Sequence, residues 1–241
     1  MFRNKALLVL IAFSICAITH AQKDYARKVV DTLASPYMAG RGYDYDGDKK
    51  AAKYIADQMK SFGLLHFGND YTQSLSFNVN TFPDKIDVSV GITNAGMNIT
   101  MKQEAGADYI VLPNSCSLKG TFPVVKLNNK IYSDKAKMYE FTRTDHRKQF
   151  IVVYDADPTI KEQKDLYAYA IHNPFKAKGV IILCNKLTEE TSDTVANYVL
   201  INAITNSKFD SATSITVDIQ NKFIKNYTSQ NLIGYVKGTV K

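Results

Sequence analysis

The sequence is poor in the residue types that build metal sites and nucleophile sites. Its 241 residues include four histidines, three cysteines and no tryptophan. His66, His146 and His172 stand far apart, and none belongs to a His-x-Asp pair or to a His-Glu-x-x-His helix motif that would hold zinc. We therefore predict no catalytic residue and no metal ligand in this chain. We expect His146, in the polar stretch RTDHRK, to be exposed.

Other catalytic motifs are absent as well, including the Gly-x-Ser-x-Gly turn that presents a nucleophilic serine. Asp44, Asp46 and Asp48 alternate as the first ligands of a calcium-binding loop do, but Lys49 and Ile55 stand where that loop needs glycine and glutamate. A loose calcium site is one alternative. The other is a solvated loop in which Asp46 or Asp48 caps the following helix, and we favour Asp48.

No block of basic residues is present, although 30 lysines and arginines exceed 23 aspartates and glutamates. The scattered charges predict a solvated surface and no binding of nucleic acid. Cys116 and Cys184 could pair in an exported chain. Cys184, however, follows the apolar run GVIIL, and free cysteine is common in buried strands, so both alternatives stay open.

The first 21 residues have the features of a secretory signal peptide. Arg3 and Lys5 precede the apolar stretch Ala6–Ile18, and Thr19 and Ala21 supply small residues before a cleavage site. The apolar stretch is shorter than the roughly 20 residues that span a bilayer. We expect a periplasmic or secreted protein with no membrane span after cleavage.

Helical periodicity is confined to a few segments. Residues 23–33 and 52–62 carry apolar residues at the spacing of one helix face. Gly63 is placed to end the second helix in a left-handed conformation. Two further helices are expected over residues 134–142 and 161–172.

Most of the remaining chain is predicted to form strands, because apolar residues alternate with polar ones or form short continuous runs. A further apolar segment covers residues 195–204. The expected strands cover residues 71–79, 86–92, 98–103, 108–113, 122–127, 150–156, 180–184, 213–219 and 231–239.

The loop MAGRG, Met38–Gly42, has an unusual composition. Gly40 and Gly42 would let the backbone approach another surface closely, and Arg41 offers a fixed fork of hydrogen-bond donors. One interpretation is a contact to a carboxylate or to backbone carbonyls at a domain junction. The alternative is a flexible loop with an exposed arginine.

Three stretches resemble one protein family. LASPYMAGRGYDYDGDKKAAKYIADQMKSFGL, Leu33–Leu64, resembles the N-terminal signature of secreted two-zinc aminopeptidases of the leucyl aminopeptidase and glutamate carboxypeptidase II superfamily. FIVVYDADPTIKEQKDLYAYAIHNPFKAKGVIIL resembles the strand–helix–strand core of a protease-associated domain. SQNLIGYVKGT resembles the segment that re-enters the catalytic sheet. The resemblance implies a signal peptide (1–21), a peptidase-domain segment (22–80), a protease-associated-like inserted domain (81–228) and a strand that re-enters the catalytic domain (229–241).

The implied fold is α+β, with two N-terminal helices, a β-rich protease-associated-like domain with a few helices, and the first strands of an incomplete α/β peptidase domain. In the family, two zinc ions activate a bridging water while a glutamate moves the proton. Those groups lie in the catalytic domain, and none can be assigned to a residue here. The resemblance therefore implies the N-terminal accessory portion of an exported zinc aminopeptidase, itself inactive and without a cofactor. Its partner would be the catalytic domain or a peptide substrate.

Two other hypotheses stay open. The chain could be an exported, noncatalytic module with a protease-associated fold that binds proteins or peptides. It could also be a noncatalytic relative that keeps the peptidase fold without the metal site, as the transferrin receptor does. A binding module should close its last strand and finish with a polar tail, but the segment Val236–Lys241 stops abruptly. We therefore expect a fragment, a truncated reading frame or half of a split gene.

The signal peptide gives a direct test. Mass spectrometry of the exported protein should find Gln22 as the N-terminal residue, in free or cyclised form, because Ala21 precedes the expected cleavage site. A mature chain that begins at Met1 would contradict the assignment.

Overall fold

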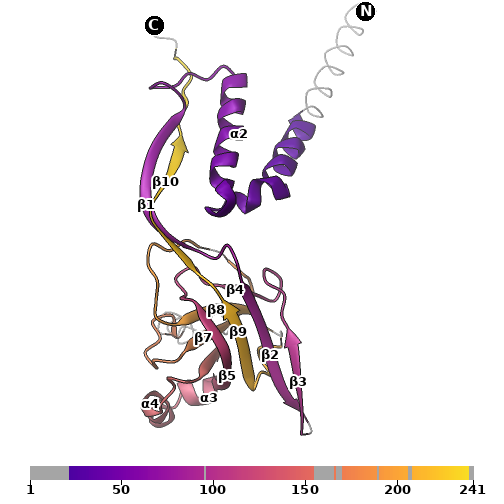
Figure 1. Ribbon diagram of the computed structural model, residues 1–241, viewed down its shortest axis with the longest axis vertical. Coiled ribbons are helices and arrows are strands. Elements are labelled where there is room, and N and C mark those ends of the chain that lie inside the picture. The colour runs from indigo at the N-terminus through magenta and orange to yellow at the C-terminus, as the bar shows by residue number, and fades with distance from the viewer. Residues whose placement is uncertain are drawn as a thin grey trace, which may run out of the picture. The chain divides into compact units, whose positions relative to one another are not determined.

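The computed structural model describes residues 22–238, except Ala95, residues 155–165 and 167–169, Glu189, and residues 206–207. The chain divides into two compact units. Unit 1 comprises Met1–Leu75 and Thr228–Lys241, and unit 2 comprises Ser76–Tyr227. The paired strands β1 (Thr72–Thr81) and β10 (Lys222–Leu232) each pass from one unit into the other (Figure 1). The predicted signal peptide lies outside the described residues.

Unit 1 contains both predicted N-terminal helices. Residues 22–33 form the first, and α2 (Gly47–Ser61) forms the second. Two short 3-10 turns lie between them, η1 (Pro36–Arg41) and η2 (Asp44–Asp46). Gly63 has a φ of 70° and donates its N–H to the carbonyl of Lys60, as expected for a glycine that ends a helix.

The apolar faces of these helices are only partly covered. Ala51 and Ala52 are buried, whereas Val30 is 63% exposed and Phe62 is 61% exposed. Ile55 is exposed as well. A helix of a globular protein normally buries its apolar stripe. Unit 1 therefore leaves apolar surface in water that other small domains would cover.

Unit 2 is built on one mixed sheet of eight strands, in the order β3-β2-β9-β5-β6-β7-β8-β4. The pairs β5–β6, β6–β7 and β7–β8 are parallel, and the other pairs are antiparallel. Together with the helices, this sheet gives an α+β fold. Its strands are β2 (Ile86–Asn94), β3 (Met97–Lys102), β4 (Tyr109–Val111), β5 (Leu118–Leu127), β6 (Phe150–Tyr154), β7 (Gly179–Cys184), β8 (Val199–Ile204) and β9 (Ser214–Ile219).

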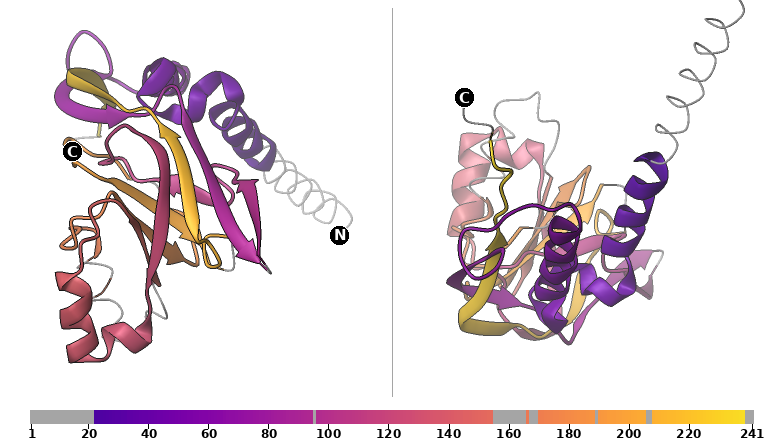
Figure 2. Two further views of the ribbon diagram at one scale, coloured as in Figure 1. Left: turned by 60° about the horizontal axis from the view of Figure 1, so that its bottom comes forward. Right: turned by 90° about the horizontal axis from the view of Figure 1, so that it is seen from above.

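The core of unit 2 lies on both faces of the parallel strands. Along β7, Ile181 and Leu183 join one apolar cluster, while Val180 and Ile182 join the other. Helices α3 (Asn129–Tyr132) and α4 (Lys135–Arg143) pack against the second cluster (Figures 1 and 2). Strands covered on both faces read as continuous apolar runs, which explains why the sequence predicted β6 and β7 well.

The predicted helix over residues 161–172 is described only in part. Leu166 and Ala170 are helical and fully buried in the second cluster, and most of the segment lies outside the described residues. The short helix expected over residues 134–142 is confirmed as α4. Its N-cap residue, Asp134, accepts hydrogen bonds from the N–H groups of Ala136 and Lys137.

One strand was predicted in the wrong place. The sequence suggested residues 231–239, but β10 covers Lys222–Leu232, and only its last residues fall in the predicted range. β10 pairs with β1 in a two-stranded sheet, and much of it is exposed. A ribbon that buries little surface needs no apolar alternation, so its polar sequence gave no strand pattern.

Amide exchange should distinguish the two units. We expect amides of residues 22–64 to exchange at least about tenfold faster than those of β6 and β7, because the helices of unit 1 bury less apolar surface. Hydrogen–deuterium exchange read by mass spectrometry measures both regions in one experiment. Equal protection would mean that the helices open only when the whole chain unfolds.

Candidate functional site

The Gly-Arg loop of unit 1 follows the first helix and has an irregular backbone. Ala39, Gly40 and Arg41 take positive φ values of 44°, 66° and 60° in succession. Nη1 of Arg41 donates a hydrogen bond of 2.5 Å to the carbonyl of Leu33, near the end of the first helix. The last carbonyls of a helix lack partners within the helix and carry partial negative charge. Arg41 therefore stabilises the end of the first helix.

The close backbone approach expected at Gly40 and Gly42 occurs instead at Gly47. A Cβ atom on Gly40 would meet nothing within 4 Å, and one on Gly42 would meet only a carbonyl at 3.9 Å. A Cβ atom on Gly47 would lie 2.6 Å from the carbonyl oxygen of Met38 and 2.9 Å from that of Gly42. The loop thus packs onto the start of α2, and only glycine fits there. The prediction of a close approach at Gly40 and Gly42 was therefore wrong, because the close approach occurs at Gly47.

Asp48 is not the helix cap that the sequence suggested. Helix α2 begins at Gly47, one residue earlier, because Gly47 already has helical angles of −59° and −42°. The N-cap residue is Asp46, whose carboxylate accepts a hydrogen bond from Nζ of Lys49 and makes no capping bond to the backbone. Asp48 lies in the first turn, where a carboxylate is favoured by the helix dipole.

Asp48 instead connects two distant parts of the sequence. Its Oδ2 atom accepts a hydrogen bond of 2.7 Å from the hydroxyl of Ser229. Leu65 and Tyr235 also pair through two backbone hydrogen bonds of 2.9 Å each. The stretch around α2 and the stretch around Ser229, which both carry the resemblance to aminopeptidases, therefore belong to one structural unit. The role of Gly40, Arg41 and Gly42 at a domain junction stays a proposal.

His66 and His146 are held by local hydrogen bonds. His146 was expected to be exposed, but it is 2% exposed. Its ring nitrogens lie 2.8 Å from Oε1 of Gln149 and 2.9 Å from the carbonyl oxygen of Phe141. The prediction was wrong because the ring of His146 packs against Phe141 and Phe175, which the polar local sequence does not indicate.

Neither cysteine forms a disulfide, which settles the alternative that the sequence left open. Cys184 is buried at the end of β7, as expected from its apolar surroundings. Cys116 is half-buried, and desolvation by burial raises the pKa of its thiol. A raised pKa lowers the fraction of thiolate, which is the nucleophilic form. Cys116 therefore lacks the environment of a catalytic cysteine.

The described residues do not form a zinc site. Within residues 22–238, outside the gaps named above, no three histidine, cysteine, aspartate or glutamate side chains lie close enough to hold a metal ion. Structural and catalytic zinc sites need three or four such ligands. No catalytic step through zinc can be built on the described part of this chain. In the same part of the chain, no helix combines the length and the apolar character needed to cross a bilayer.

Comparison with known proteins gives limited information. No protein-family model and no curated protein matches the chain. Two solved structures of BSAP, a zinc aminopeptidase from Bacillus subtilis, are similar to it. The first is 17% identical with a TM-score of 0.46, and the match covers 90% of this chain and 48% of the other. The second is 18% identical with a TM-score of 0.41, covering 78% and 41%.

The chain spans less than half the length of these solved structures. At such identities and TM-scores, the likeness does not decide the family, the fold or the function of this chain.

The packing of the loop on α2 can be tested by adding one methyl group. Alanine usually stabilises a helix by up to about 1 kcal/mol over glycine. We expect Gly47→Ala to lower the free energy of unfolding by about 1–3 kcal/mol instead, because the added Cβ would overlap the Met38 and Gly42 carbonyls. Urea unfolding followed by circular dichroism measures the change.

Gly68→Ala is the matched control, since a Cβ atom there would meet nothing within 4 Å. Its effect should stay within about 0.5 kcal/mol. A Gly47→Ala variant as stable as the wild type would show that the loop does not rest on the helix.

Proposed function

We propose that this chain is the accessory portion of an exported zinc-dependent aminopeptidase, and that unit 1 binds the α/β catalytic domain of that enzyme. The proposal is supported by the resemblance of Leu33–Leu64 and of the SQNLIGYVKGT stretch to two-zinc aminopeptidases. The observation that carries it is the exposed apolar surface of unit 1.

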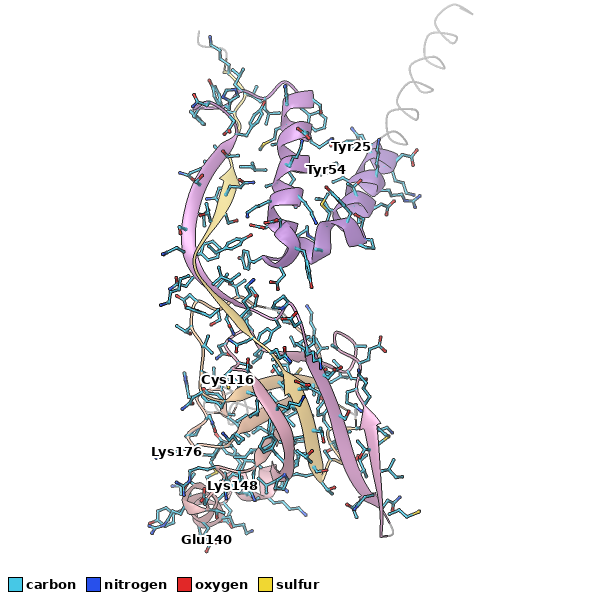
Figure 3. The ribbon with its side chains drawn as sticks, viewed as in Figure 1. Tyr25, Tyr54, Cys116, Glu140, Lys148 and Lys176 are labelled. Atoms are coloured by element: carbon cyan, nitrogen blue, oxygen red, sulfur yellow. The ribbon has the colours of Figure 1, made fainter. Side chains whose placement is uncertain are left out.

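Unit 1 is the smaller unit, yet it holds ten of the fourteen large apolar side chains that are exposed among the described residues. Covering a side chain of this size is worth roughly 1.5–3 kcal/mol. Exposed apolar surface on this scale is typical of a protein–protein interface. The ten residues are Tyr25, Val30, Tyr37, Tyr45, Ile55, Phe62, Leu65, Phe67, Ile233 and Val236; Tyr25 is labelled in Figure 3.

The chemistry of peptide hydrolysis would belong to the catalytic domain. That domain would supply two zinc ions, their ligands and the general base, because the described residues of this chain offer no metal-binding group. The residues Gly40, Arg41 and Gly42 and helix α2 would serve as scaffold. Unit 2 would be an accessory domain that contacts the peptide substrate or limits its access.

The second candidate is an exported, noncatalytic module that binds proteins or peptides. One observation favours it: unit 2 has its own core of fully buried side chains, including Phe150, Ile181 and Ile201. A domain with such a core needs no partner to fold. The exposed side chains of unit 1 favour the first candidate, because a free-standing module would have no use for them.

Zinc content and activity provide the first test. We expect the purified chain to contain well under one zinc per molecule and to hydrolyse aminoacyl substrates at the background rate, because the described residues lack a ligand cluster. Elemental analysis and a leucine anilide assay measure these quantities. Stoichiometric zinc together with turnover would contradict the accessory role.

Capture of activity separates the two candidates. The tagged chain, incubated with the exported proteins of its source, should retain aminopeptidase activity that a zinc chelator abolishes. The variant Val30→Asp/Phe62→Asp should retain at least about tenfold less aminopeptidase activity, because burying one charge at an interface costs more than 1.4 kcal/mol. Met97→Asp, an exposed apolar position in unit 2, is the control and should behave as wild type. Failure to capture activity, or equal capture by all three, would favour the binding module.

A further inference from the structure

The amino ends of the three parallel strands β6, β7 and β8 lie side by side in unit 2, and the residues that precede these strands form one site. Arg147 precedes β6, Lys176 and Lys178 precede β7, and Tyr198 precedes β8. The N–H of Lys178 donates to the carbonyl of Gln149 at 2.9 Å, and the carbonyl of Lys178 accepts from the N–H of Val199 at 3.1 Å. These bonds hold the three loops together.

The loops line a cavity of about 470 Å³ that is open to solvent. Small-molecule sites in proteins have volumes of roughly 300–1,000 Å³. Four of the side chains that line the cavity can carry positive charge, and among the residues that the structure describes no carboxylate lines it. Asn197 and Tyr198 add polar groups from the loop before β8. The four basic residues are Arg147, His172, Lys176 and Lys178; Lys176 is labelled in Figure 3.

The charges of the two lysines are not compensated nearby. Among the ion pairs of the described residues, none includes Lys176 or Lys178. Arg147 is the exception, because Asp145 accepts hydrogen bonds from its Nε and Nη2 atoms at 2.9 Å and 2.8 Å. The Arg147 side chain holds the pKa of Asp145 well below its usual range. Within the described part of the chain, Lys176 and Lys178 thus keep positive charges that no ion pair balances.

Asp145 also fixes the direction of Arg147. A guanidinium has five N–H donors in a rigid fork, and two of them face Asp145, which leaves three for another acceptor. A second, adjoining cavity of about 280 Å³ is also lined by Arg147 and Lys176. Arg147 and Lys176 therefore line both cavities.

The backbone of the loop before β7 is fixed around Lys176, whose side chain is exposed. Lys176 has a φ of 56° and Asn173 has a φ of 45°, a left-handed conformation that non-glycine residues seldom adopt. The side chain of Asn173 donates to the carbonyl of Ala177 and accepts from the N–H of Ala177, both at 2.9 Å. Asn173 is 7% exposed, so these bonds are shielded from water. Such backbone geometry persists only where the surrounding structure enforces it.

We infer that this cavity binds a small anion with two negative charges on oxygen, such as a phosphate ester or a dicarboxylate. Lys176 and Lys178 supply the matching charges, and Arg147 supplies a paired set of donors, which suits the planar carboxylate and the phosphate group. The site lies within unit 2 and does not rest on the proposed aminopeptidase role.

Titration with two simple probes tests the site. Inorganic phosphate and succinate are each titrated into the protein at one low, constant ionic strength, with acetate as the singly charged comparison. At least one of the two dianions should bind saturably and more tightly than acetate, and shifts of backbone amide signals should be largest over residues 145–149, 172–178 and 197–198. Saturable binding of phosphate but not of succinate would identify a phosphate site. Saturable binding of succinate but not of phosphate would identify a dicarboxylate site.

Variants that remove or keep the lysine charges test which side chains bind the anion. Lys176→Gln/Lys178→Gln should weaken binding at least about tenfold, because hydrogen bonds to charged groups are the strong ones. Lys176→Arg/Lys178→Arg should keep binding within a few-fold. Lys148→Gln removes one positive charge, half of what the double variant removes, from a neighbouring position outside the lining. Lys148 is labelled in Figure 3, and its replacement should change affinity by less than about twofold.

Two results would overturn the inference. One is the absence of saturable binding by either dianion. The other is equal weakening by Lys148→Gln and by Lys176→Gln/Lys178→Gln, which would indicate a general attraction to a basic surface. Circular dichroism and the melting temperature of each variant establish that it is folded.

Discussion

The parallel pairing of β6 with β7 and of β7 with β8 is the constraint on which unit 2 depends. Parallel neighbours require a crossover between them, so the intervening segments must leave one end of the sheet and return to the other. The connection between β6 and β7 covers one face of β7 with Leu166, Ala170 and Phe175. The other face is covered by side chains of β2 and β9 and by Phe209. The same geometry gathers the residues before each strand at one end. The cavity lined by Arg147, Lys176 and Lys178 is therefore a result of the topology.

Unit 1 depends on contacts between residues far apart in sequence. The hydrogen bond from Ser229 to Asp48 and the pairing of Leu65 with Tyr235 bring the end of the described chain to helix α2. The stacked rings of Phe67 and Tyr235 add an apolar contact between the same two segments. Many other apolar side chains of unit 1 remain exposed, whereas unit 2 is held by a closed apolar core.

Local signals predicted much of this fold. The first two helices, the left-handed Gly63 and the buried strand β7 each follow from residues within a few positions of one another. The predictions that were wrong share a different cause. The position of β10, the burial of His146 and the close approach at Gly47 depend on groups brought from elsewhere in the chain. The basic cavity could not be predicted, since its lysines and Arg147 meet only when three loops assemble. The predicted cap at Asp48 was wrong by two residues, because α2 begins at Gly47 and its N-cap residue is Asp46.

The two free thiols of unit 2, Cys116 and Cys184, have consequences for the oxidation of the chain. Cys184 is 8% exposed and its Sγ atom donates to the carbonyl of Lys186, so reagents in solution reach it poorly. Burial raises the pKa of the Cys116 thiol, which leaves little of the reactive thiolate at neutral pH. Exchange with disulfides in an oxidising compartment is slow for such thiols. The fold of unit 2 thus does not depend on a bond between Cys116 and Cys184, and it needs no oxidation of these two thiols.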